Sequence, residues 1–161
     1  MSQYAATTEV SSERSRAEIE RTLTRWRASG FMYGWDNDRA LVGFVLNDRQ
    51  VRFEITMPDR EDKRFKRSNH KPPRPLTPTQ SAAAYEQACR QLWRALSLVI
   101  KAKLEAIESG IATFENEFLA QLVLPDGRTV GDAVTPRILD GIDHSEMPSL
   151  LPEFETKAIN A

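Results

Sequence analysis

Apolar side chains recur every three or four residues in the segment PTQSAAAYEQACRQLWRALSLVIKAKLEAIES, residues 78–109. Thr77 and Pro78 favour a helix start and Gly110 a helix end, so the segment predicts one long helix. Its apolar stripe comprises Tyr85, Cys89, Leu92, Leu96, Val99, Ile100, Leu104 and Ile107, with Trp93 at its border. Burying about seven such side chains is worth roughly 10 to 20 kcal/mol before the entropy of ordering is subtracted. We therefore expect this helix to form the core.

The composition fits one domain of the α+β class. The 161 residues are 40% apolar and 28% charged, which is enough for one core and too little for two. We predict a flexible leader at 1–10, a single domain at 11–141 and an acidic tail at 142–161. No apolar run is long enough to span a bilayer, and the N-terminus lacks a signal-peptide core, so no membrane partner is expected. The single cysteine, Cys89, is predicted to fill the core, and a reducing, cytoplasmic location follows.

A first helix is predicted upstream of the strands. Ser11 or Ser12 can cap its first turn, and Ser29 with Gly30 can end it. The inward face is narrow and comprises Ile19, Leu23 and Trp26. Such a face can pack on one partner only.

A three-stranded antiparallel meander is predicted over residues 31–57. The strands cover 31–35, 39–46 and 49–57, and Asn47-Asp48 forms a tight hairpin turn. This register gathers one apolar face that comprises Val42, Phe44, Val51, Phe53 and Ile55. We expect the long helix to pack on that face.

The position of three aromatic residues depends on the turn at Asp36–Asp38. A three-residue turn places Phe31, Tyr33 and Trp35 on the opposite, mixed face beside Arg52, a layout that resembles the base-stacking platforms of single-strand-binding modules. A two-residue turn places them in the core. We prefer the second alternative, because aromatic stripes at this spacing usually belong to a core.

A long basic loop is predicted at 59–77, where apolar periodicity is absent and prolines are frequent. It holds seven Lys/Arg against three Asp/Glu, whereas residues 113–161 hold three against nine. A phosphate backbone is one partner for such a loop, and a solvated linker is the alternative. The candidate nucleic-acid-binding residues are Arg60, Lys63, Arg64, Phe65, Lys66, Arg67, Lys71 and Arg74 in the loop and Arg52 on the sheet.

Short elements follow Gly110. Thr113 can cap a helix that carries Phe114, Phe118 and Leu122, a hairpin is predicted around 125–127, and a last small helix at 132–139 ends at Gly141. The acidic tail carries three apolar anchors for a partner protein, which are Leu150, Leu151 and Phe154. The tail either covers its own core or docks on a partner.

The sequence predicts no catalytic residue, metal site or cofactor. His70 and His144 stand in no nucleophile motif, and the sequence has no glycine-rich phosphate loop. A carboxylate metal site is the weaker alternative, and it would need Asp36, Asp38 and Glu54 to converge, joined by Glu115, Glu117 or Asp126. Turn and helix-cap roles explain these acids equally well. We therefore expect a protein that is not an enzyme.

Several segments together resemble a known family. They are VSSERSRAEIERTL (10–23), DRALVGF (38–44), MPDR (57–60), ACRQLWRALSLVIKAKLEAIESGIATFENEFL (88–119) and LPDGRTVGD (124–132). The chain resembles, over about residues 4–152, a family of small proteins of unassigned function encoded by tailed bacteriophages and prophages. The resemblance implies a phage accessory protein that acts in the cytoplasm of a bacterial host, and it carries over no catalytic residue.

Two functions remain as hypotheses. The first is non-enzymatic nucleic-acid binding through the basic loop and the sheet, in DNA metabolism or recombination. The second is a protein-interaction module that inhibits or adapts a host or phage enzyme. A homo-oligomer is compatible with both.

Overall fold

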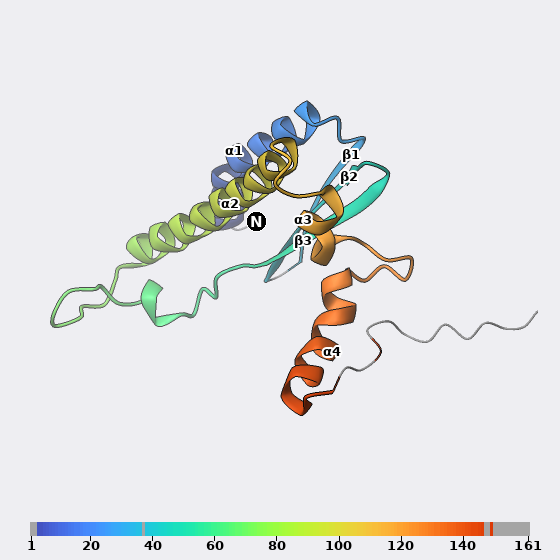
Figure 1. Cartoon of the computed structure of the whole chain (residues 1–161). Coiled ribbons are helices and arrows are strands. Elements are labelled where there is room, and N and C mark those ends of the chain that lie inside the picture. Colours follow the sequence, from blue (N-terminus) through green and yellow to red (C-terminus); the bar gives the residue numbers. More distant parts are fainter. Residues whose placement is uncertain (1–2, 37, 147–148, 150–161) are drawn as a thin grey trace, which may run out of the picture.

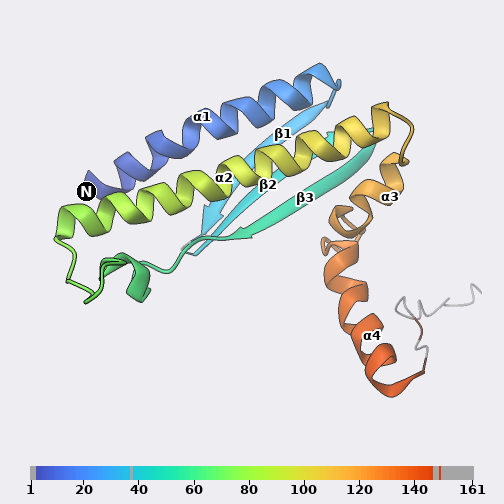
Figure 2. The same cartoon turned by 60° about the vertical axis from the view of Figure 1, so that its left-hand side comes forward.

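The computed structural model describes residues 3–36, 38–146 and 149, and it has the expected α+β architecture. Two long helices cover one face of a three-stranded sheet, and short helices follow at the edge of the sheet (Figures 1 and 2). The elements are α1 (Gln3–Arg25), β1 (Gly30–Asp36), β2 (Arg39–Leu46), β3 (Arg49–Thr56), the 3-10 turn η1 (Lys63–Phe65), α2 (Pro78–Glu108), α3 (Phe114–Phe118), the 3-10 turn η2 (Leu119–Gln121) and α4 (Val130–His144).

The long helix α2 forms as predicted from its end signals. The Thr77 hydroxyl accepts from the N–H of Gln80 and the Gln80 side chain accepts from the N–H of Thr77, a reciprocal cap that satisfies two free amides. At the other end Gly110 adopts a φ of 72°, which glycine reaches without strain. The helix therefore begins and ends within a residue or two of the predicted limits.

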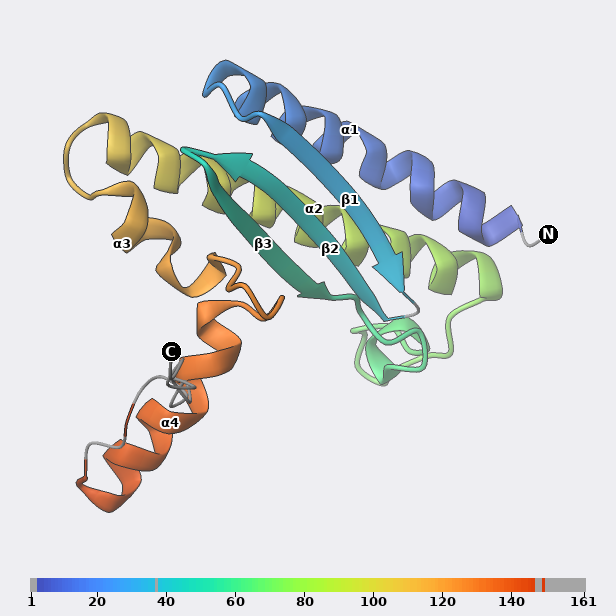
Figure 3. The same ribbon diagram turned by 90° about the vertical axis from the view of Figure 1, so that its right-hand side faces the viewer.

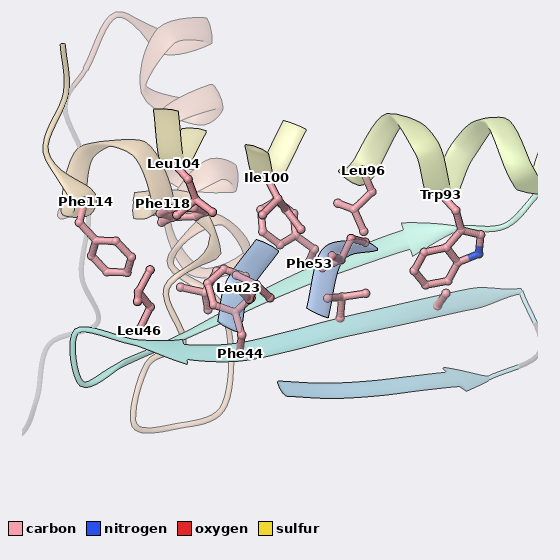
Figure 4. Close-up of a cluster of buried hydrophobic side chains, with 14 residues drawn as sticks. Leu23, Phe44, Leu46, Phe53, Trp93, Leu96, Ile100, Leu104, Phe114 and Phe118 are labelled. Carbon is pink, nitrogen blue, oxygen red and sulfur yellow. The ribbon is translucent and has the colours of Figure 1, made fainter. Parts of the chain in front are cut away.

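The buried stripe of α2 differs from the predicted one at several positions, since Leu92 and Ile107 are only partly buried and Ser97 is buried. The largest differences are at two residues. Trp93, expected at the border, is 1% exposed, whereas Val99, expected in the stripe, is 44% exposed. The stripe follows the spacing four, four, three, four, four through Tyr85, Cys89, Trp93, Leu96, Ile100 and Leu104. Figure 4 shows Trp93, Leu96, Ile100 and Leu104 reaching from α2 toward the sheet. The large indole fills this space because Tyr33 lies opposite it on β1, with ring centroids 5.3 Å apart.

The sheet is an antiparallel meander in the order β1-β2-β3. Asn47 and Asp48 both have positive φ, 52° and 56°, and Leu46 pairs with Arg49, which confirms the predicted hairpin turn. Asp36 pairs with Arg39, so the first turn also has two residues. Phe31, Tyr33 and Trp35 consequently share a face with Val42 and Phe44, which confirms the predicted face. Phe31 and Tyr33 pack against the core, whereas Trp35 is 64% exposed, so the expectation that all three are core residues is wrong for Trp35. The alternative that placed these three aromatic residues on the mixed face beside Arg52 is wrong.

The first helix is longer at its start and shorter at its end than predicted. It begins at Gln3, so the flexible leader predicted at 1–10 is helical from residue 3, and the start at Ser11 or Ser12 is wrong. The helix ends at Arg25 because Arg27 adopts a left-handed φ of 62°. The N–H groups of Ala28 and Arg27 then bond back to the carbonyls of Leu23 and Thr24, which satisfies the last turn. Ile19 and Leu23 are buried as expected.

The C-terminal elements extend the sheet edge and then leave it. Val123 donates its N–H to the carbonyl of Gln50 at 2.9 Å, which attaches the segment after η2 to β3. Helix α4 then runs away from the two-layer body (Figures 2 and 3). It covers Val130–His144 rather than 132–139, so Gly141, expected to end both the helix and the domain, lies inside α4 and is buried. Leu150, Leu151 and Phe154 lie outside the described residues.

Candidate nucleic-acid interface

The basic loop after β3 is a folded element. Asp62 caps the turn η1 by accepting from the N–H of Arg64, and a small hairpin follows. In that hairpin the Ser68 N–H donates to the Arg74 carbonyl at 2.8 Å and the Leu76 N–H donates to the Lys66 carbonyl at 2.9 Å. The loop therefore holds its basic residues on a defined backbone. The sequence, which lacks apolar periodicity here, did not predict this order, and neither did the alternative of a solvated linker.

Phe65 anchors the loop to α2. Its side chain is 3% exposed and meets the Tyr85 ring edge to face at 5.6 Å, with Cys89 in the same cluster. This position does not support the prediction that Phe65 contacts nucleic acid, because a ring buried in a cluster offers no face for stacking. The Arg60 guanidinium lies over the face of the Tyr85 ring, 4.0 Å from the ring centroid.

Burial also sets the chemistry of Cys89. Desolvation raises the pKa of the Cys89 thiol, and desolvation likewise raises the pKa of Tyr85. Both groups therefore stay protonated at neutral pH. Cys89 is fully buried and packs as the small core residue that the sequence predicted.

Apart from Arg60, which lies over the Tyr85 ring, the loop cations divide into two sets. Arg64 pairs with Asp62 at 3.3 Å and Lys66 pairs with Glu61, so two cations are engaged locally. The second set makes no ion pair among the described residues, its side chains are exposed, and it comprises Lys63, Arg67, Lys71 and Arg74. Lys63, Lys66 and Arg67 line an open depression of about 330 Å³. This second set is the part of the predicted site that is available for an anion.

Arg52 does not belong to this surface. Its side chain is 19% exposed, donates to the Gly127 carbonyl at 2.7 Å and pairs with Glu54 at 3.1 Å and with Asp132 at 3.8 Å. This position does not support the prediction that Arg52 contacts nucleic acid, since three protein partners engage its guanidinium. Its role is to join β3 to the turn and the helix start that follow it in space.

The segment LPDGRTVGD forms that turn and helix start. The Asp126 carboxylate accepts from the Arg128 N–H and pairs with the Arg128 guanidinium at 2.8 Å, and Gly127 takes a φ of 85°. Thr129 and Asp132 then form a reciprocal cap on α4. Turn and cap geometry thus explains why Asp126, Gly127, Arg128, Thr129 and Asp132 stand in this segment.

Acid is expected to loosen the start of α4. A hydrogen bond from the Thr129 side chain lowers the pKa of Asp132, and the Thr129 N–H and Arg52 add to the effect. A lowered pKa stabilises the fold fully above the unfolded-state value of about 3.9, and this contribution is lost as the pH falls through the folded-state value. Amide exchange protection of residues 130–133 should therefore fall in acid, as measured by NMR.

The matched control for this acid effect is Asp132→Asn, which keeps an acceptor oxygen at the cap and cannot titrate. Its protection at the start of α4 should vary less with pH than that of the parent. Identical acid profiles in the two proteins would show that Asp132 is not responsible.

The carboxylates of the metal-site alternative do not gather. Glu54 pairs with Arg52, Glu117 with Lys103 at 3.4 Å and Asp126 with Arg128. Within the described ranges, no three His, Cys, Asp or Glu side chains are placed to hold a metal ion. Over the same residues, every helix falls short of the length and apolar character needed to cross a membrane.

A feature that the sequence reasoning missed lies at the end of β1. Trp35 belongs to the core-facing side by register, yet its residue is 64% exposed. The alternating pattern assigns a face and cannot show where the covering helices leave that face open.

Comparison of the chain with protein-family models, with curated proteins and with solved structures found no match. The assignment of a function therefore rests on the geometry of the chain itself.

Proposed function

We propose that this is a non-enzymatic accessory protein that binds nucleic acid through its basic loop, in the cytoplasm of a bacterial host. The observation that carries the proposal is the anchored loop, which presents Lys63, Arg67, Lys71 and Arg74 without an ion pair among the described residues. An anchored loop has already lost its conformational freedom on folding, so less entropy is lost when it binds. The bacteriophage role in DNA metabolism or recombination remains part of the proposal.

The expected strength of binding follows from the number of cations. Each phosphate contact contributes a slope of about −0.9 in log K against log salt on duplex DNA, and about −0.7 on single strands. Four cations should therefore give a slope of about −3 to −4 and weak binding at physiological salt. Such a surface positions a nucleic acid without reading its sequence.

Reversing the four cations to glutamate, in the variant K63E/R67E/K71E/R74E, should remove most of the binding. The expected loss is at least tenfold at about 50 mM salt, with a flatter salt dependence, because the phosphate contacts are lost. Fluorescence anisotropy with labelled DNA and RNA, titrated at several salt concentrations, measures both quantities.

The matched control reverses four exposed cations on α1 and α2, in the variant R21E/R25E/R94E/K101E. Both variants change the net charge equally, so only the location differs. Equal losses in the two variants would show that the loop is not the site. A parent protein that binds neither single-stranded nor duplex nucleic acid at low salt would refute the proposed function.

A second candidate function is protein interaction through α4. This helix projects from the body, and its exposed apolar side chains are Ile138, Leu139 and Ile142. Retention of one stoichiometric partner from bacterial lysate after nuclease treatment, with loss of that partner in Ile142→Asp, would favour this function. Sedimentation of the purified protein separates this outcome from association of the chain with itself.

A further inference from the structure

Three aromatic rings form a ladder from the core to the surface. Trp93 of α2 is buried, Tyr33 of β1 lies 5.3 Å from it, and Trp35 lies 5.8 Å beyond Tyr33 with a ring tilt of 36°. The Arg16 guanidinium of α1 covers Tyr33 at 4.2 Å. The inner rings are held by α1 and α2, so the outermost ring has a supported position while 64% of its residue is exposed.

The ladder ends at the same end of the sheet at which the basic loop begins. Asp36 pairs with Arg39 and Arg39 pairs with Thr56, so the residue after Trp35 and the last residue of β3 lie in one row. The loop follows at once, and Met57 donates its N–H to the Asp38 carbonyl at 2.6 Å. Figure 3 shows the end of β1 beside the loop.

The helix α2 supports both features. Tyr85 and Cys89 hold the loop anchor Phe65, and Trp93 holds the ladder. These three residues follow each other at intervals of four, so the two supports are only about 6 to 12 Å apart along the helix axis. The exposed indole and the anchor of the basic loop are therefore supported by neighbouring turns of α2, at the end of the sheet where the loop begins.

We infer that Trp35 is a stacking site for an unpaired base of single-stranded nucleic acid whose phosphates lie on the basic loop. The inference rests on the proposed function and specifies its substrate class. Stacking of a base on an aromatic side chain is worth about 1 to 3 kcal/mol by alanine substitution and needs no particular sequence, because every base has a π face. Bases inside a duplex are stacked on each other, so a duplex binds the loop cations and leaves Trp35 unused.

The test compares Trp35→Ala with the parent protein on oligo(dT) and on a blunt duplex of the same length. The substitution should weaken oligo(dT) binding by about 5- to 150-fold, which is the stacking energy converted to affinity. Duplex binding and the salt slope should stay the same, since no phosphate contact is removed. Trp35→Phe should recover much of the loss, because a smaller ring still stacks.

Met32→Ala is the matched control, because Met32 lies on the same strand, is 51% exposed and points to the opposite face. It should bind both ligands as the parent does. Unchanged oligo(dT) binding by Trp35→Ala, with both ligands still lost on reversal of the loop cations, would overturn this inference and leave the proposed function standing. Equal losses on oligo(dT) and duplex would also overturn it, because Trp35 would then not distinguish unpaired bases.

Discussion

Replacement of Leu96 by aspartate is expected to abolish the native fold. Leu96 lies at the centre of the α2 stripe, is 8% exposed and belongs to the main core cluster. A carboxylate there would have to ionise without a partner or bind a proton, and either outcome costs several kcal/mol. Since a domain of this size has only about 5 to 15 kcal/mol of stability, we expect a molten or insoluble protein. Near-ultraviolet circular dichroism and a thermal melt measure the loss.

The control is Arg94→Asp, two positions away on the exposed side of the same helix. Surface substitutions of this kind usually change stability by less than about 0.5 kcal/mol. An unchanged melting temperature for Leu96→Asp would mean that the stripe faces solvent or another chain, and α2 would then be an association surface.

Truncation of Phe65 to alanine is the second large effect. Phe65, Tyr85 and Cys89 form a cluster separate from the main core. Loss of a buried phenylalanine costs about 3 to 5 kcal/mol, and a loop with so few other anchors should respond by local opening rather than by global unfolding. Trypsin should then cut at Lys63, Lys66 or Arg67 in protein whose α2 is still folded.

Binding gives an independent measurement on the same variant. Phe65→Ala keeps every loop cation, yet its affinity for nucleic acid should fall because the loop must be ordered again on binding. Phe65→Leu, which still fills the cluster in part, should lie between the parent and the alanine variant. Resistance of Phe65→Ala to trypsin equal to that of the parent would show that the hydrogen bonds of the loop hold it without the anchor.

The sequence predicts the sheet and the long helix well for local reasons. Asn47 and Asp48 tolerate positive φ, so a two-residue turn and its register follow. The start of α2 depends only on the four residues 77–80, in which Pro78 occupies the first helical position and Thr77 and Gln80 cap each other. Such a local signal does not depend on tertiary packing. The end of α1 was missed because the left-handed position at its C-terminus is occupied by Arg27, where glycine is the usual signal.

The candidate site was predicted less well because it depends on contacts between distant segments. Phe65 stands among charged residues with no periodicity, so no pattern marks it as buried. Arg52 carries the charge expected of a binding residue, and only the fold shows Gly127 and Asp132 around it.

The lengths of α2 and of the strands give one indication that another segment must cover part of α2. The 31 residues of α2 span about 46 Å, whereas strands of eight residues span about 27 Å. About 19 Å of the helix therefore has no strand opposite it, and apolar side chains in that part need another cover. The basic loop and its Phe65 provide that cover over Tyr85 and Cys89.

Because Cys89 is buried beneath the loop, the reactivity of its thiol reports on the opening of the loop. The chain has one cysteine, so any thiol-specific reagent can report on one location only. Because the thiol is buried, alkylation requires the cluster around Phe65 to open, and the rate of labelling rises with the fraction of time that the cluster is open. A ligand that binds the loop should lower the rate of Cys89 alkylation. The dependence of that rate on ligand concentration gives the dissociation constant without any label on the ligand.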